Sequence, residues 1–484
     1  MLWKFLLNNK KDIFVFIFFC LFLPLFLYNL GSYSLEDFDE AWFGEIARNI
    51  LINKNPIALT FNGSSFYDHP PAGYNLIAAS IFLFGPTEFA VRLPSAVLGF
   101  LSLFLLYLTG KNLFGRTVGF GASLILASSV WFIFRARSGN LDTILVFFFI
   151  LTFYLTIKLK KSNNYVFLLA VSFALLILTK SLVGIVMVIP VISFILINKV
   201  KIPWRKIVYS VFIFSFIIIT WLYTNTASIG PFFLVKLARI GLRPDSSSTA
   251  NYFDLLNSQT LTYLHYGIRK WYYPGLLSII FTLFLTLKNK DLIPVLLWAF
   301  LLLFGYVNNS KTEIWHMLPL YPPIALLIAF TINFLVTAAV GKIKRHLNIQ
   351  TKKQIATLIF IMSILPISVL TSKQIYDFRD EIKLFDTTKS GLSQSALAAR
   401  GRKEDLYLDS DLPVPGVAAF YSQKHVHVLI QNPAPANNLK GQMTYGKRPF
   451  LLLTETWRLE SDKISSDSYM VLAEKNGHLL IKVE

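Results

Sequence analysis

Four carboxylates lie within five residues near the start of the chain, at Glu36, Asp37, Asp39 and Glu40. Carboxylates at this spacing repel one another, so a purely structural role would be costly without compensation. A place in a functional site is the alternative to that structural role. The structural alternative is the solvated N-terminus of a helix, where the helix dipole favours acidic side chains. The residues alone leave both interpretations open.

A second group pairs a carboxylate with an imidazole, at Asp68 and His69, directly before Pro70 and Pro71. Such a pair can orient the imidazole, bind a metal ion or grip a phosphate. Two prolines suit the first turn of a helix, and they predict one that runs toward Phe84. A surface turn whose polar side chains face water is the alternative.

Further ionisable residues stand inside or beside apolar segments. Asp142 heads an otherwise apolar run, Lys180 separates two apolar runs, and Arg135 and Arg137 precede Asp142. Ionisable groups at membrane depth are costly and are functional candidates, although Arg and Lys can also extend toward the membrane surface. A buried carboxylate that faces cations is what a site for an anionic lipid phosphate needs.

The composition places these residues in a membrane protein. Of the 484 residues, 54% are hydrophobic and 15% are charged, and the mean hydropathy is +0.55. A soluble domain of this length needs more polar side chains to cover its surface. The single cysteine, Cys20, excludes a disulfide or a cysteine-based zinc site within one chain. Eleven apolar stretches predict membrane helices, at residues 12–30, 89–109, 117–134, 140–157, 164–179, 181–198, 207–224, 272–287, 292–307, 316–340 and 354–371.

The distribution of positive charge orients these helices. With the N-terminus in the cytoplasm, the loops on that side carry nineteen Lys and Arg residues against two acids, so they hold +17 of the net charge of +19. This is the positive-inside rule, and it explains the basic composition without a nucleic-acid partner. The first apolar run has no obvious cleavage site and is interpreted as a retained anchor of a multi-pass cell-membrane protein.

Three segments are expected on the outer face: the first loop (31–88), a loop near 226–270, and the tail. In the first loop, Ser34 to Asp37 has the form of a capping box, and the apolar spacing that follows predicts a helix along the membrane surface. The tail at 372–484 is predicted to be a small α/β domain that follows a transmembrane domain at 1–371. Its predicted elements are a helix at 415–422 and strands at 405–409, 426–430, 449–454, 468–472 and 479–483.

Six short motifs occur in order between residue 39 and about residue 327. They are Asp39-Glu40-Ala41, His69-Pro70-Pro71, Arg92-Leu93-Pro94-Ser95-Ala96, Arg137 followed by Asp142, Thr179-Lys180-Ser181, and Met317-Leu318-Pro319-Leu320-Tyr321-Pro322-Pro323. This order resembles the GT-C glycosyltransferases, specifically the family that joins protein O-mannosyltransferases with aminoarabinose transferases acting on lipid A. The resemblance implies a mainly α, polytopic bundle of about 11–13 transmembrane helices, with amphipathic helices at the membrane surface.

The resemblance also implies a chemistry. Such enzymes take a sugar from a polyprenyl-phosphate carrier and pass it, with inversion, to a hydroxyl acceptor outside the membrane. Asp39 would be the general base, supported by Glu40. Asp68 matches an acid that helps to bind metal in some relatives. The residues that would bind the donor phosphate or sugar are His69, Arg137, Asp142, Lys180, Tyr67 and Tyr321.

The chain departs from the family pattern in three places. Trp42-Phe43 stands where the aminoarabinose branch often has Arg-Tyr, Ser181 replaces a glycine, and the family's Glu-His motif in the second large loop is not evident. The residues require no cofactor, and a divalent ion at Asp37, Asp39 or Asp68 is left open. The sugar and the acceptor, whether a cell-envelope lipid, glycan or protein, are open as well.

A polytopic transporter of lipid or polysaccharide is the alternative function. Such a protein would show internal repeats and polar residues on both sides of the bilayer midplane. The sequence has no convincing repeat, and its polar groups gather on the predicted outer face. This pattern favours the enzyme.

Overall fold

A computed structural model describes residues 10–180, 182–242, 259–307, 312–343, 349–410, 415–429 and 438–484, and the structural statements below concern these residues. Ser181 of the Lys180 motif lies outside them. The chain divides into two compact units. Unit 1 is Met1–Tyr28, Asp68–Gly73 and Ser95–Leu384, and unit 2 is Asn29–Tyr67, Tyr74–Pro94 and Phe385–Glu484. Unit 2 thus joins most of the first predicted loop to the tail, while the predicted membrane boundary at residue 371 stays a prediction.

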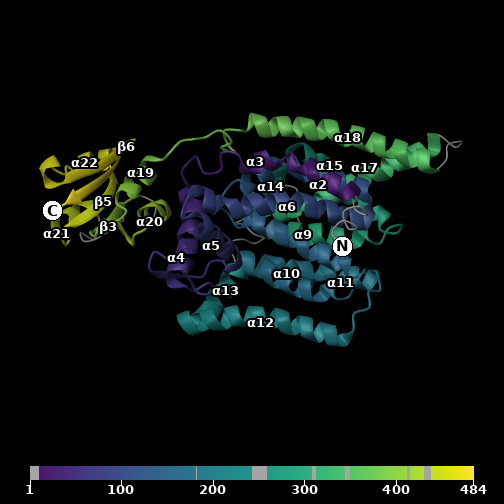
Figure 1. Ribbon diagram of the computed structural model, residues 1–484, viewed down its shortest axis with the longest axis horizontal. Helices are drawn as coiled ribbons and strands as arrows, with labels where there is room; N and C mark the ends of the chain where they lie inside the picture. The colour runs from purple at the N-terminus through teal and green to yellow at the C-terminus, as the bar shows by residue number, and fades with distance from the viewer. Residues whose placement is uncertain are drawn as a thin grey trace. The chain divides into compact units, whose positions relative to one another are not determined.

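Unit 1 is helical, with most of its helices side by side along one direction (Figure 1). Each of the eleven predicted stretches coincides with a helix or a broken helix. The elements are α2 (Lys10–Cys20), α3 (Leu23–Leu27), α6 (Glu88–Phe114, which starts in unit 2), α7 (Arg116–Ala127), α8 (Val130–Ala136), α9 (Asp142–Lys158), α10 (Tyr165–Lys180), η2 (Leu182–Met187), α11 (Val188–Ile197), α12 (Trp204–Ile229), α13 (Phe232–Leu242), α14 (Gln259–Ile268), η3 (Arg269–Trp271), α15 (Tyr272–Leu285), α16 (Leu292–Val307), η4 (Ile314–Leu320), α17 (Tyr321–Ile343) and α18 (Ile349–Asp377).

Several of these helices are apolar enough for a lipid bilayer. By length and composition, four described helices can cross a membrane: α6, α12, Ile314–Val340 and α18. The pair α7 and α8, bent by 71°, makes a fifth if it is one span, and shorter apolar helices accompany them. The protein is therefore mainly α-helical and multi-pass, and the predicted number of spans stays a prediction.

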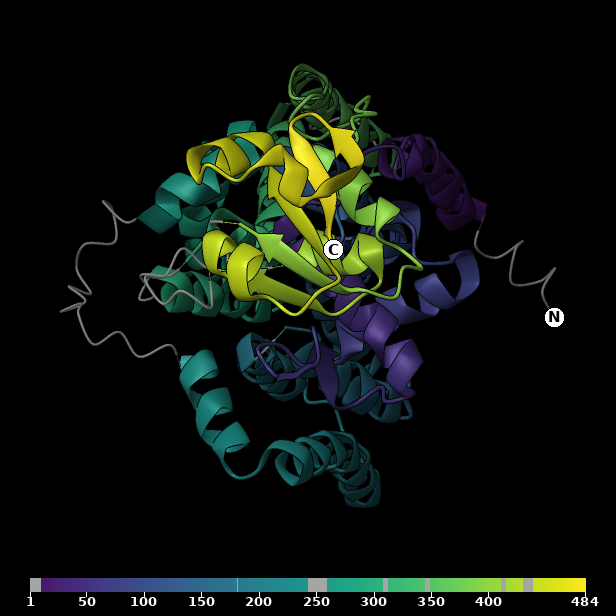
Figure 2. The same ribbon diagram turned by 90° about the vertical axis from the view of Figure 1, so that its left-hand side faces the viewer.

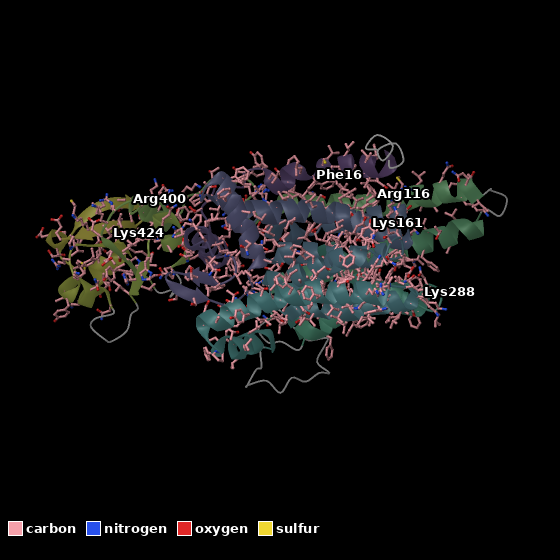
Figure 3. The ribbon with its side chains drawn as sticks, turned by 60° about the horizontal axis from the view of Figure 1, so that its bottom comes forward. Phe16, Arg116, Lys161, Lys288, Arg400 and Lys424 are labelled. Carbon is pink, nitrogen blue, oxygen red and sulfur yellow. The ribbon has the colours of Figure 1, made fainter. Side chains whose placement is uncertain are left out.

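The basic loops of unit 1 gather at one end of its helices. Arg116, Lys161 and Lys288, which come from three different loops, lie toward the same end (Figure 3). Asn198, in the loop between α11 and α12, links two of these loops, since it accepts from Lys160 at 2.9 Å and donates to Asp291 at 2.9 Å. This clustering is what the positive-inside pattern predicts, and the orientation of the termini stays a prediction.

Unit 2 contains a mixed sheet with helices beside it (Figure 2). The strand order is β4-β3-β5-β7-β6; β3 pairs in parallel with β4 and β5, and β7 pairs antiparallel with β5 and β6. All five predicted strands and the predicted helix of the tail are confirmed. The elements are η1 (Asp37–Ala41), α4 (Trp42–Asn53), β1 (Leu59–Phe61), β2 (Ser64–Phe66), α5 (Ala72–Phe84, which starts in unit 1), α19 (Gly391–Ala398), β3 (Asp405–Asp409), α20 (Gly416–Ser422), β4 (Val426–Leu429), α21 (Leu439–Tyr445), β5 (Phe450–Glu455), α22 (Thr456–Ser461), η6 (Ser466–Ser468), β6 (Met470–Lys475) and β7 (His478–Val483).

The central strand β5 explains the stability of this sheet. Its residues Phe450 to Leu453 are all buried, and β5 lies between β3 and β7 in the middle of the sheet. Phe450 and Leu452 join Ile481 and Val483 of β7 in one apolar cluster. A continuous apolar run is typical of a strand buried on both sides.

The expected capping box in the first loop is wrong. Helix α4 begins only at Trp42, without a side-chain cap. The Ser34 hydroxyl instead lies 2.7 Å from the Ser393 hydroxyl and accepts a hydrogen bond from the Ser390 amide. Residues far away in the sequence therefore satisfy Ser34, and the acidic residues after it occupy the tight turn η1 rather than a regular helix.

We expect Gly119→Ala in α7 to destabilise the protein by about 1–3 kcal/mol, the usual cost of overpacking. A Cβ there would lie 2.7 Å from the Lys111 amide nitrogen of α6 and closer still to the Tyr107 carbonyl oxygen. Thermal unfolding in detergent, followed by intrinsic fluorescence, measures the effect. Gly305→Ala in α16 is the control, because no atom lies within 4 Å of a Cβ there. Equal unfolding temperatures for the two variants would contradict the close packing of α6 on α7.

Candidate active site

The most strongly charged buried cluster of unit 1 is built on Asp142. Arg135 Nη2 donates to Asp142 Oδ2 at 2.8 Å, and the Lys180 ammonium forms an ion pair with Oδ1. Asp142 is 1% exposed and Arg135 is 7% exposed. The structure thus brings together two of the predicted donor-site residues, Asp142 and Lys180, and adds Arg135.

A break between α7 and α8 positions Arg135. The Ser128 and Ser129 hydroxyls both donate to the Ile125 carbonyl, and the Trp271 indole donates to Ser128 Oγ at 3.0 Å. Such bonds from serine to the preceding turn compete with the helix and bend it. After the break, α8 runs for seven residues and ends beside Asp142, with Arg135 in its last turn.

Asn140 positions Asp142. Its side-chain oxygen accepts from the Thr143 amide at 3.1 Å, and its side-chain nitrogen donates to the Arg135 and Ser138 carbonyls. The first role satisfies an amide at the start of α9, which would otherwise lack a partner. The second ties the link back to α8, so the carboxylate and the guanidinium face each other.

The electrostatics of this cluster favour an anion. One carboxylate faces two cations, and His316 lies within electrostatic reach as well. The His316 ring accepts from the Glu313 amide through Nδ1 at 3.0 Å, which places the proton of the neutral ring on Nε2. Charges in a low-dielectric site interact strongly, so Lys180 and Arg135 are chemically suited to bind a phosphate.

The segment with Asp68 and His69 packs near this cluster. Gly73, which ends that segment, abuts the Leu141 side chain and lies near the Thr179 carbonyl, the neighbours of Asp142 and Lys180. His69 is half-buried. Partial loss of hydration raises the pKa of the Asp68 carboxyl, although more than a third of this residue is exposed, and Lys236 of α13 works against the shift.

Two other predicted donor-site residues have different surroundings. Arg137 is fully buried, and its guanidinium donates to the carbonyls of Leu25, Ile382 and Lys383 at 2.9–3.4 Å. Tyr321 is 2% exposed, and its hydroxyl, which abuts Gly267, has no hydrogen-bond partner among the described residues. The donor roles of both residues stay predictions. The contacts of Arg137 and Tyr321 described here are typical of side chains that pack between helices.

In unit 2, Asp39 has an unusual backbone conformation. Its φ of 63° and ψ of −75° fall in the region of a strained γ-turn, which residues with a side chain rarely adopt. The turn is closed by hydrogen bonds from the Ala41 amide to the Glu36 carbonyl and from the Trp42 amide to the Asp39 carbonyl. Strained residues of this kind cost about 1–3 kcal/mol and concentrate at functional sites.

A buried ion pair supports this turn. Arg92 donates to both oxygens of Glu40 at 2.8 and 2.7 Å, and both side chains are buried. The remaining donors of Arg92 bind the carbonyls of Leu30, Tyr33 and Ser34. One arginine therefore ties the chain before the turn to the residue after Asp39. The supporting role predicted for Glu40 in catalysis stays a prediction.

The tail also contacts the acidic turn within unit 2. Asp37 Oδ1 accepts from the Val417 amide of α20 at 2.7 Å, and the Tyr421 hydroxyl accepts from the Leu35 amide at 2.9 Å. Burial raises the pKa of the Asp37 carboxyl, and the amides of Gly416 and Val417 partly offset that rise. Asp37 is thereby engaged with the protein. Tyr67, also in unit 2, is half-buried at the end of the first loop's hairpin.

The structure adds residues that the sequence did not assign to the site. Arg135 and His316 stand beside motif residues in the sequence, and Arg92 lies inside one of the six motifs but was given no role. Their partners lie from seven to 174 positions away in the sequence (Arg135 to Asp142, His316 to Asp142), so only the fold identifies them. Among the described residues, no three His, Cys, Asp or Glu side chains form a group that could hold a metal ion. A divalent ion at Asp68 stays a prediction.

The fold matches known membrane glycosyltransferases. The crystal structure of ArnT from Cupriavidus metallidurans bound to undecaprenyl phosphate superposes with a TM-score of 0.72 and 15% identity, over 97% of each chain. The archaeal oligosaccharyltransferase AglB from Archaeoglobus fulgidus, in complex with an inhibitory peptide and a dolichol-phosphate, gives 0.56 at 11% identity, over 93% of this chain and 70% of that one. The fold is thus that of the GT-C class.

Sequence comparison narrows the class. The family model of dolichyl-phosphate-mannose-protein mannosyltransferases matches residues 68–223. An undecaprenyl phosphate-alpha-4-amino-4-deoxy-L-arabinose arabinosyl transferase of Pseudomonas savastanoi pv. phaseolicola is 36% identical over 122 residues, which are 25% of this chain and 23% of that one. An uncharacterized protein of Aquifex aeolicus is 25% identical over 86% of this chain and 82% of its own. Together these matches support a GT-C glycosyltransferase of the protein mannosyltransferase and aminoarabinose transferase type.

We expect Asp142→Asn to destabilise unit 1 by about 3–5 kcal/mol, because it leaves the two buried cations without their shared carboxylate. Lys180→Met should cost less, since Arg135 still neutralises Asp142. Thermal unfolding in detergent compares the two variants. A larger loss of stability for Lys180→Met than for Asp142→Asn would show that the carboxylate is not the centre of the cluster.

Proposed function

We propose that the protein transfers a sugar from a polyprenyl-phosphate carrier to a hydroxyl acceptor on the outer side of the cell membrane. The observation that carries this proposal is the buried Asp142 carboxylate with its two cations, Lys180 and Arg135. Paired in this way, the cations stay charged in an apolar bundle. Lysine and arginine side chains of this kind can bind the phosphate of a lipid through charge-assisted hydrogen bonds.

Similar proteins support the donor class. The ArnT structure is bound to undecaprenyl phosphate, and the AglB structure is in complex with a dolichol-phosphate. Both carriers are polyprenyl phosphates, so a sugar attached to such a carrier is the donor that we propose here. The identities of the sugar and of the acceptor are left to experiment.

In the proposed reaction, Asp39 removes the proton from the acceptor hydroxyl, and the acceptor oxygen attacks the anomeric carbon from the face opposite the phosphate. The bond between the anomeric carbon and the phosphate oxygen breaks, and its electron pair stays on that oxygen. Lys180 and Arg135, with His69, stabilise the added charge on the leaving phosphate. The configuration at the anomeric carbon is inverted.

We also propose a topology with a cytoplasmic N-terminus and an extracytoplasmic tail. The basic loops gather at one end of unit 1. One of them joins the end of α9 to the start of α10, and Asp142 and Lys180 lie at the other ends of these two helices. The positive-inside rule puts the basic end in the cytoplasm. The donor phosphate would then be bound at the outer membrane surface.

The tail, in this proposal, positions the acidic turn. Helix α20 is held by Asp37, and Tyr421 of the same helix binds the backbone of Leu35. Both contacts involve residues that come just before Asp39 in the chain. Because a strained conformation persists only when its surroundings enforce it, the tail keeps Asp39 in the geometry that we assign to the base.

We expect Asp39→Asn to reduce sugar transfer by at least about 100-fold, the usual contribution of a general base. Asn tolerates positive φ, so the turn should persist. The assay uses proteoliposomes loaded with undecaprenyl-phosphate hexose or aminoarabinose donors and measures the release of free undecaprenyl phosphate. Asp467→Asn, an exposed acid in η6, is the control. Unchanged transfer would exclude Asp39 as the base, and movement of the carrier without transfer would support the transporter.

We expect Asp37→Ala to lower the transfer rate by about 10- to 100-fold through misplacement of Asp39. Asp37→Asn should restore most of that loss, because its amide oxygen can still accept from the Val417 amide. The turnover number should fall while the Michaelis constant for the donor stays unchanged. If Asn fails as completely as Ala, Asp37 acts through its charge, as a metal ligand or a base, and the positioning role is wrong.

A further inference from the structure

The basic end of unit 1 contains a polar cavity. Its volume is about 490 Å³, and it lies between the loop that joins α9 to α10 and the loop that joins α11 to α12. Polar side chains from both loops line it: Lys160, Lys161, Asn163, Asn198, Lys199 and Lys201. Lys206 at the start of α12 donates to Asn163 Oδ1 at 2.6 Å, and this hydrogen bond connects α12 to the loop between α9 and α10.

Four lysines, Lys160, Lys161, Lys199 and Lys201, contribute positive charge to this cavity. In the described part of the chain, none of the four lysines forms an ion pair with a carboxylate. Lys160 donates to Asn198 Oδ1 at 2.9 Å, and Asp291 is engaged by the other side of that amide, through Asn198 Nδ2. Four cations around one hollow repel one another, and an anion bound between them would relieve that repulsion.

An apolar groove adjoins the cavity along the same helices. It has a volume of about 200 Å³ and lies between α10, α11 and α12, lined by Val166, Phe173, Val188, Ile192 and Phe214 among others. One apolar cluster connects the two hollows, since Leu159 and Val200 border the cavity and Val166 borders the groove. The cations of the cavity and the apolar surface of the groove are therefore next to each other.

This place is far from the proposed donor site. Helix α9 begins at Asp142 and ends at Lys158, and α10 begins at Tyr165 and ends at Lys180. With a rise of about 1.5 Å per residue, the two ends of this hairpin are about 24 Å apart. The exposed Trp204 at the start of α12, next to the cavity loop, is typical of a helix end at the headgroup level of a membrane.

We propose that this cavity binds the phosphate headgroup of an anionic glycerophospholipid from the leaflet opposite the Asp142 cluster, with an acyl chain in the groove between α10, α11 and α12. The lysines recognise the phosphate. A soluble anion would use the cavity alone. The apolar groove beside it favours a lipid. The bound lipid would fix the loops that join α9 to α10 and α11 to α12.

Native mass spectrometry of the purified full chain tests this proposal. The probes are phosphatidylglycerol and phosphatidylcholine with identical acyl chains, undecaprenyl phosphate, and inorganic phosphate. We expect one phosphatidylglycerol to be retained per chain in preference to phosphatidylcholine. Lys161→Gln/Lys199→Gln should weaken its binding about 30-fold, because each lysine near a lipid surface contributes roughly a factor of five.

The control is Lys288→Gln/Lys290→Gln, which removes the same charge from another basic loop and leaves the cavity lining intact. Binding that falls equally in both variants, or in neither, would overturn the proposal. Displacement of phosphatidylglycerol by millimolar inorganic phosphate would identify a site for soluble anions instead. Stronger retention of undecaprenyl phosphate than of phosphatidylglycerol would reassign the site to the carrier lipid. These measurements do not depend on sugar transfer, so they are separate from the test of the proposed activity.

Discussion

The pairing of a carboxylate with cations away from water is the constraint on which the rest of this structure depends. An isolated charge in an apolar bundle is very costly, and Asp142 removes that cost for both Lys180 and Arg135. Because two cations share one acid, the three side chains are held together. The break at Ser128 and Ser129 positions Arg135, and the side-chain amide of Asn140 positions Asp142. The three charged side chains meet as a result.

Unit 2 also contains a carboxylate paired with a cation away from water, but this pair has a different role. There the pair of Arg92 and Glu40 is balanced, and the remaining donors of the arginine bind backbone carbonyls, so this pair organises the chain and leaves no excess charge. The result is a rigid frame around a single strained residue, Asp39. The buried ion pair of Glu40 and the contact of Asp37 with the tail thus hold the chain on both sides of this residue.

Much of the fold could be predicted from the sequence because the signals are local. Apolar runs locate helices wherever lipid or a covered core surrounds them, and the alternation and composition of the tail located its five strands. Asp142 and Lys180 stood out since a charge in an apolar run needs a partner. The sequence could not show that Arg135, rather than Arg137, pairs with Asp142. The bend after α7 decides in which direction each of these two side chains points.

The amino-acid sequence by itself determined that this is a multi-pass helical protein with a small α/β tail, with basic loops on one side and acids and imidazole grouped in order between apolar runs. Hydrophobicity and charge act at short range along the chain, so their pattern is readable without coordinates. Only the tertiary structure decided that Ser34 pairs with Ser393 rather than capping a helix, that Asp37 holds α20, and that four lysines from two loops surround one cavity. These contacts join residues that are tens to hundreds of positions apart, and their energies depend on geometry that no local pattern records.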